Sequence, residues 1–214
     1  MKKGDFLWAI ALGAFIAFIV TPSTHQIFIA MTTNFPLVAG FIKFAYLATL
    51  GELLATRIVS GDWKKPPAIL WRAVIWGLLG AVITMVFHIY ATGVTSVLKT
   101  GMLPGEGITL VFAFLTSALM NCLFAPTFMA IHRCTDTYLD LKYGEGVAKP
   151  SLKLVVERID WYGFISFVLL KTIPFFWIPA HTITFLLPAE YRTLVAAMLS
   201  IALGGILAFA KKKK

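Results

Sequence analysis

Long apolar runs alternate with short polar breaks along the chain. The runs cover about residues 6–20, 36–59, 69–98 and 108–132, then a stretch that begins at residue 161, and finally residues 191–210. A membrane-spanning helix needs about 20 predominantly apolar residues. The pattern therefore predicts an all-α, polytopic membrane bundle of about six helices, within one membrane domain over residues 1–214. Five or six of these helices are expected to span, because the first either crosses the membrane or lies in its interface.

The composition agrees with a membrane protein and excludes a large soluble domain. Apolar residues make up 59% of the chain and charged residues only 14%, whereas a soluble domain has about 25% charged residues. Mean hydropathy is +0.84. About six spans of about 20 residues and their connections take up most of the 214 residues.

The lysine and arginine residues predict the orientation in the membrane. The net charge is +9, but the basic residues form short clusters between apolar runs, which is typical of topology signals rather than of nucleic-acid binding. With six spans and both termini cytoplasmic, 15 lysines and arginines lie on the inner side and 2, Lys99 and Arg192, on the outer side. The asymmetry predicts cytoplasmic N- and C-termini. Because no organellar transit sequence is recognisable, we expect a bacterial cytoplasmic membrane, with lipids and no nucleic acid as partners.

The only sizeable hydrophilic segment covers residues 133–160. Apolar side chains recur there at helical spacing, opposite charged ones, and the apolar set is Leu152, Val155, Val156 and Ile159. A helix with one apolar and one charged face suits the membrane surface. We therefore expect a cytoplasmic amphipathic linker.

The fifth apolar stretch contains the strongest candidate chemistry. Lys171 lies in a run of aromatic and aliphatic residues that Pro174 and Pro179 interrupt. Inside a helix, each proline removes a backbone donor and frees a carbonyl. Unwound backbone at membrane depth is tolerated where it lines a cavity. The prolines therefore predict a broken or kinked span that lines a polar interior.

Charged and polar residues in several apolar segments predict a polar layer near the middle of the bilayer. An unpaired charge there costs about 2.5–3.5 kcal/mol, and helix lengths place Glu52 within reach of Lys171. We expect these two side chains to pair, with Asn121, His181 and Trp177 completing the lining of a pore. The pair is either a structural contact that fixes helix register or part of an ion-coupled gate. Asn121 and His181 likewise have a structural alternative, as buried groups that bond neighbouring helices.

Short motifs in a shared order carry a resemblance to a known family. The last part of the chain follows a signature of tryptophan, proline, phenylalanine, proline and tyrosine-arginine, in Trp177, Pro179, Phe185, Pro188, Tyr191 and Arg192. Earlier, Gly51 precedes an acidic residue, and Pro126 ends a Phe-Ala-Pro run. This order resembles the Mpv/PMP family of mitochondrial inner-membrane and peroxisomal membrane proteins. His181 and Thr184 stand where the family signature has amides.

The resemblance implies an integral membrane protein linked to channel-like or small-metabolite transport. We therefore expect a channel or transporter for small metabolites or ions, with a small anionic or metabolite substrate and a second copy of the chain among its partners. The alternative is a scaffold without transport, in which stripes of small residues bind partners or lipids. These stripes are Ala9, Gly13 and Ala17, and Ala196, Ser200, Gly204 and Ala208.

Catalysis has the least support in the sequence. His132, Asp136 and Asp140 share one face if a helix runs through them, and paired carboxylates at a membrane surface suit Mg²⁺ and phosphotransfer. A solvated helix end explains the same three residues. No Ser/His/Asp, HExxH or phosphate-loop pattern is present, and Cys122 and Cys134 lack the spacing of a zinc site. We expect neither an enzyme nor a bound metal or cofactor.

Overall fold

The computed structural model describes residues 2–212, with side chains through Ile206. Over this range the regular secondary structure is helical, without strands, as the hydropathy pattern predicts. Predictions that involve the side chains of Ala208 and of Lys211 to Lys214 lie outside the described part. The chain forms two compact units, one of Met1–Thr84 with Thr193–Lys214 and the other of Met85–Arg192. The expectation of one membrane domain stays a prediction.

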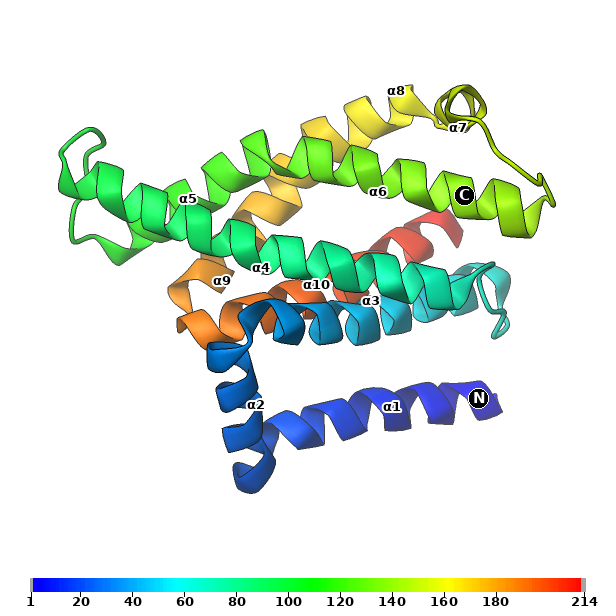
Figure 1. Cartoon of the computed structure of the whole chain (residues 1–214), viewed down its shortest axis with the longest axis horizontal. Helices are drawn as coiled ribbons and strands as arrows, with labels where there is room; N and C mark the ends of the chain where they lie inside the picture. The colour runs from blue at the N-terminus through cyan, green and yellow to red at the C-terminus, as the bar shows by residue number, and fades with distance from the viewer. Residues whose placement is uncertain (1, 213–214) are drawn as a thin grey trace. The chain divides into compact units, whose positions relative to one another are not determined.

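The first unit begins with three helices that meet at prolines. They are α1 (Lys3–Val20), α2 (Pro22–Asn34) and α3 (Pro36–Ser60). Pro22 and Pro36 begin α2 and α3 at positions where a backbone N–H would have no helical partner, so the missing donor costs little. α2 crosses from the end of α1 to the start of α3 (Figure 1). The two prolines thus define the corners of this unit.

Glycines let α3 approach two other helices of the first unit. These are α4 (Ile69–Lys99), through its first half, and α10 (Ala189–Lys212). A Cβ at Gly40 would lie only 2.8 Å from the carbonyl oxygen of Gly80, and a Cβ at Gly51 would lie 3.2 Å from the α10 backbone. Small residues at such contacts are typical of helices that associate within a membrane.

One carboxylate ties the start of α1 to the C-terminal end of α3. Asp5 accepts hydrogen bonds from Arg57 Nε at 2.9 Å and from the indole Nε1 of Trp63 at 2.8 Å. Next to it, Lys2 Nζ forms an ion pair with Asp62 at 2.9 Å. α1 has no buried residue, so polar contacts of this kind hold it beside α3.

The second unit contains a bent helix pair. α5 (Thr109–Leu123) and α6 (Ala125–Leu139) meet at an angle of 47°. The sequence predicted one span over residues 108–132, and the structure divides it at Phe124. Pro126 explains the break, because a proline ring clashes with the carbonyl four residues earlier and cannot continue an α-helix undisturbed.

The fifth apolar stretch stays helical throughout. It consists of α8 (Trp161–Gly163), η2 (Phe164–Trp177) and α9 (Ile178–Leu186). The span is therefore not broken at Pro174 or Pro179, whereas the predicted alternative of a kinked span that lines a polar interior stays a prediction. η2 is a π-helix, whose hydrogen bonds join residues five apart, and this wider turn accommodates Pro174 without the clash of an α-helix. Pro179 lies in the first turn of α9, directly after η2.

The segment 133–160 differs in part from the predicted surface linker. α6 runs on into a short π-helix, η1 (Asp140–Gly144), and α7 (Leu152–Arg158) follows after a loop. Val155 and Ile159 pack with Leu141 in a small buried cluster. The other two residues of the predicted apolar face are exposed. Half of that face therefore packs on the protein itself.

Several helices are long and apolar enough to cross a membrane. Among the described residues these are Lys3–Val20, Pro36–Ser60, Ile69–Lys99, Trp161–Leu186 and Ala189–Ile206. The bent pair of α5 and α6 would be a sixth if it forms one span. The number agrees with the five or six spans that the sequence predicts.

Candidate functional site

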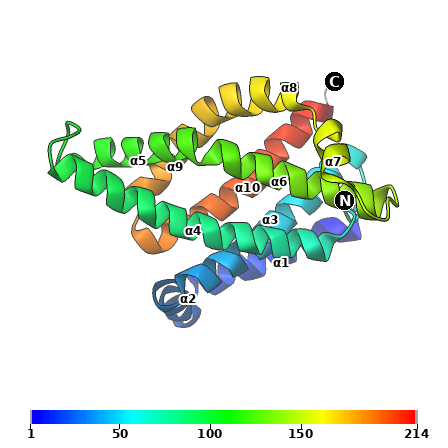
Figure 2. The ribbon, with the colours of Figure 1, turned by 45° about the horizontal axis from the view of Figure 1, so that its top comes forward.

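Small and polar side chains join α5 to α9 in the second unit. The two helices pack along each other (Figure 2). Ala113, Thr116 and Ser117 of α5 and Thr184 of α9 are each 0% exposed. The Ser117 hydroxyl donates a hydrogen bond to the backbone carbonyl of Ile178 at 2.7 Å. The first turn of α9 is thereby fixed to the middle of α5.

Asn121 and His181 form the centre of this buried network. Asn121 Nδ2 donates to the Ser117 carbonyl at 2.9 Å and lies 3.1 Å from His181 Nδ1. The opposite arrangement, in which His181 Nδ1 donates to Asn121 Oδ1, has a longer distance of 3.3 Å. The shorter contact favours Asn121 as donor and a neutral His181 that carries its proton on Nε2. The amide then uses both of its N–H groups.

Aromatic rings surround the imidazole. The ring of Trp177, the last residue of η2, stacks on that of His181 with centroids 5.1 Å apart, and Phe87 meets His181 edge-on at 5.5 Å. The indole Nε1 of Trp177 is buried and has no hydrogen-bond partner. A buried donor without a partner costs about 1–3 kcal/mol. The network therefore lies next to a donor that a polar solute could satisfy.

Three of the five residues predicted for the polar layer come together here, namely Asn121, His181 and Trp177. Lys171 does not join them, because its side chain is exposed and makes no hydrogen bond or ion pair within its unit. The sequence reasoning gave no role to Ser117. Its position four residues before Asn121, on the same face of a helix, is the signal that could have found it.

Glu52 belongs to the first unit and has partners there. The indole of Trp76 donates to Glu52 Oε1 at 2.6 Å, and Arg72 Nη1 lies 3.8 Å from Oε2. The sequence alone did not predict this contact of Arg72. The short turn between α3 and α4 was the available signal, since it makes the two helices neighbours. A pair between Glu52 and Lys171 would join the two units, and it stays a prediction.

Lys43 is a second charged residue inside an apolar helix of the first unit. It is only 4% exposed. Its Nζ donates to Thr32 Oγ1 at 2.8 Å and lies 4.6 Å from the ring centroid of Phe28. The side chain therefore extends toward α2, and α2 covers it.

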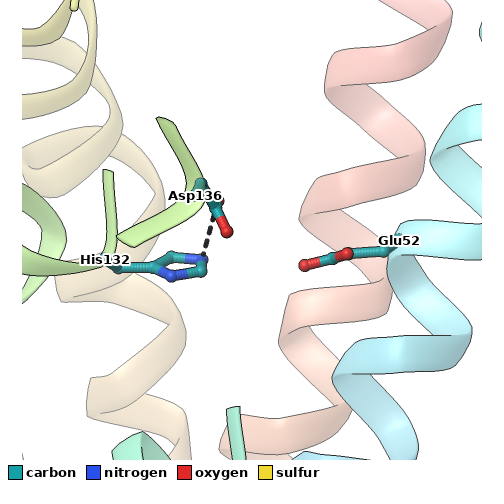
Figure 3. Close-up of side chains that lie close together, drawn as sticks. All are labelled: Glu52, His132 and Asp136. Carbon is teal, nitrogen blue, oxygen red and sulfur yellow. Dashed lines mark ion pairs between the residues drawn. The ribbon is translucent and has the colours of Figure 1, made fainter. Parts of the chain in front are cut away.

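His132 and Asp136 form an ion pair on α6, with Nε2 and Oδ2 3.5 Å apart (Figure 3). The helix runs through both residues, as their spacing predicts, and Asp140 begins η1. The pair is half-buried. The metal-dependent enzyme that the sequence offered as the least supported alternative is neither favoured nor contradicted by this geometry.

The residues that carry the family resemblance lie mainly at helix ends. Pro126 and Pro179 lie in the first turns of α6 and α9, and Pro188 precedes α10. Phe185 is 1% exposed. Arg192, directly after Tyr191 in the first turn of α10, donates from Nε to the backbone carbonyl of Leu187 at 2.9 Å. Most of these residues therefore lie where helices begin or end near the contact between α5 and α9.

The chain matches no protein-family model, no curated protein and no solved structure.

Proposed function

We propose that the protein is an integral membrane channel or transporter for small polar solutes, with the Asn121 and His181 network as part of the solute path. The observation that carries the proposal is the buried donor of Trp177 beside a neutral histidine, within apolar helices. Ionisable residues within apolar spanning helices commonly mark solute or proton pathways. An unsatisfied donor next to such a residue provides a place for a solute to bind.

The backbone around the network supports a path that changes shape. Trp177 ends the π-helical segment η2, and α5 ends at the bend before Pro126. π-helical segments occur frequently at functional sites. A transporter needs structural elements that can adopt more than one arrangement. The π-helix and the bend, which lie on either side of the network, are segments that could change arrangement in this way.

Purified protein in liposomes tests the proposal. We expect flux of small anions or metabolites, and His181→Phe should lower it at least about tenfold, because phenylalanine keeps the ring volume but loses the hydrogen bond. His88→Phe makes the same change at an exposed position of α4 and should leave the flux unchanged. Circular dichroism of the same samples separates loss of flux from loss of folding. Vesicles that stay tight to a broad solute panel, under pH gradients and voltage, would exclude transport.

We further propose a divergent, bacterial-type relationship to the Mpv/PMP family and a bacterial cytoplasmic membrane as the location. The order of the motifs supports the first, and the distribution of lysine and arginine supports cytoplasmic termini. Single cysteines at Ser23 and Ser151, both exposed, test the topology. Six spans require that a membrane-impermeant label reaches them from opposite sides.

A scaffold without transport is the second candidate, and α1 is the observation that favours it. A Cβ at Gly13 of α1 would meet no atom within 4 Å, so the small-residue stripe of this helix faces outward. The stripe of α10 is used inside the first unit, where Gly204 faces the carbonyl oxygen of Gly51. A scaffold would bind partners through α1, and its vesicles would remain tight in the liposome experiment.

A further inference from the structure

Arg192 is held in place by neutral groups. Its guanidinium carbon lies 5.5 Å from the ring centroid of Phe185 and 5.8 Å from that of Phe112. Its Nε donates to the Leu187 carbonyl at 2.9 Å. These three contacts come from α5, α9 and the turn that follows α9. They restrain the guanidinium, and none of them neutralises its charge.

Among the described residues, no carboxylate forms an ion pair with Arg192. Glu190, its nearest acid in sequence, attracts the guanidinium charge only at longer range. The chain pairs other arginines directly, since Arg57 donates to Asp5 and Arg158 donates to Glu145 at 2.7 Å. Arg192 thus differs from these structural arginines in the kind of group that surrounds it.

We propose that Arg192, restrained by Phe112 and Phe185, binds the oxygens of a small anion that carries a carboxylate or phosphate group. The Nε contact leaves the two terminal nitrogens without a hydrogen-bond partner in the structure. An arginine fork donates two parallel hydrogen bonds to such groups. Because the rings and the carbonyl already restrain the fork, binding costs less side-chain entropy.

Aromatic contacts connect this site to the buried network. Phe185 lies 5.0 Å from Phe87, and Phe87 lies 5.5 Å from His181, measured between ring centroids. An anion on Arg192 would therefore lie at one end of a series of rings that leads to the network. Anion binding at Arg192 does not require that the protein transports, so binding and flux are separate measurements.

The anionic group has two sources, a free anion or the headgroup of a lipid. Thermal melts of the detergent-solubilised full chain distinguish them. One series uses inorganic phosphate or succinate at constant ionic strength, and the other compares anionic phosphatidylglycerol with zwitterionic phosphatidylcholine. Wild type should show a saturable rise of the melting temperature in at least one series. Arg192→Gln should weaken the apparent affinity at least about tenfold, since a charge-assisted fork is lost.

Lys99→Gln is the matched control, because it removes one positive charge from an exposed position of the same unit. It should leave the response unchanged. If Arg192→Gln does not fold, Arg192→Lys keeps the charge without the planar fork and should bind about fivefold more weakly. A response to phosphate or succinate assigns a free anion, and a response to phosphatidylglycerol alone assigns a lipid. The proposal is overturned if wild type responds to neither series, or if the folded Arg192 variant responds like Lys99→Gln.

Discussion

Each unit contains a polar cluster, and the two clusters are stabilised in different ways. In the first, Asp5 and Arg57 neutralise each other across a hydrogen-bonded ion pair. In the second, Asn121 and His181 are neutral and bond each other. A buried charge needs an opposite charge, whereas a neutral polar group needs only hydrogen bonds. The second unit also keeps an unsatisfied donor at Trp177, so its network can exchange one partner for another without separating charges.

Lys43 is the exception within the first unit. A hydroxyl and an aromatic ring face its ammonium group, rather than a carboxylate. Cation–π contacts stabilise desolvated cations by about 2 kcal/mol, which offsets part of the cost of burial. In the first unit, the charges near helix ends and the charge of Glu52 have charged partners, whereas the charge of Lys43 has only neutral ones.

The largest expected effect tests which cation stabilises Glu52. Glu52→Gln or Arg72→Met alone should destabilise the protein by about 3 kcal/mol, because each removes the opposite charge from beside a desolvated one. The double variant should recover much of that loss. Thermal melts in detergent measure the coupling.

The same cycle with Lys171→Met in place of Arg72→Met tests the pair that the sequence predicts. Coupling with Lys171 and none with Arg72 would contradict the structural pair. Coupling with Arg72 alone would leave the Lys171 prediction without support. If the losses of stability are additive in both cycles, neither cation stabilises Glu52 through a charge pair.

A smaller effect is expected at the neutral network. Asn121→Leu leaves His181 Nδ1 without its donor and removes the side-chain hydrogen bond to the Ser117 carbonyl, and should cost about 2 kcal/mol. Asn34→Leu makes the same change at an exposed position and should change the stability by less than about 0.5 kcal/mol. Denaturant unfolding in detergent gives both values. Equal stability of the two variants would show that the network contributes little to folding.

The smallest effect concerns an exposed ion pair of the first unit. The hydrogen bond from Lys2, and then the one from the backbone of Trp63, lowers the pKa of Asp62 below its ordinary value. Because the folded pKa is the lower one, the stabilisation is present above a pH of about 4 and is lost as the pH falls through the folded pKa. Asp62→Asn should lower the melting temperature near neutral pH by about one degree. The difference from wild type should shrink in melts at lower pH, and a constant difference would contradict this cause.

The sequence predicted the positions of most long apolar helices well, because apolar runs and helix-end residues leave local signals, although it did not predict α2. α3 is the clearest case. It begins at Pro36, which is suited to the first turn, and ends before Gly61, whose φ of 71° favours glycine. The prediction of residues 36–59 differs from the observed end by one residue. Asn121, His181 and Trp177 were also predicted for one layer, and the structure brings them together.

The features that the sequence did not predict depend on how helices are rotated about their axes and on how tightly their turns are wound. Hydropathy does not distinguish a turn with bonds five residues apart from one with bonds four apart, so the π-helix around Pro174 left no signal. The sequence has a proline in both places, and its apolar pattern does not show that the helix bends before Pro126 and stays helical at Pro174. The contact of Arg72 with Glu52 depends on how α3 and α4 are rotated about their axes, which their apolar composition does not specify.

The Asp5 contact has a consequence for the order in which the chain is made. Arg57 and Trp63 follow Asp5 by 52 and 58 residues. At about 5–20 residues per second, a ribosome adds them roughly 3–12 s after Asp5. The Asp5 contact therefore cannot form until the end of α3 and the turn after it have been made. Asp5 can stabilise the place of α1 beside α3, but it has no partner there while α1 itself is being made.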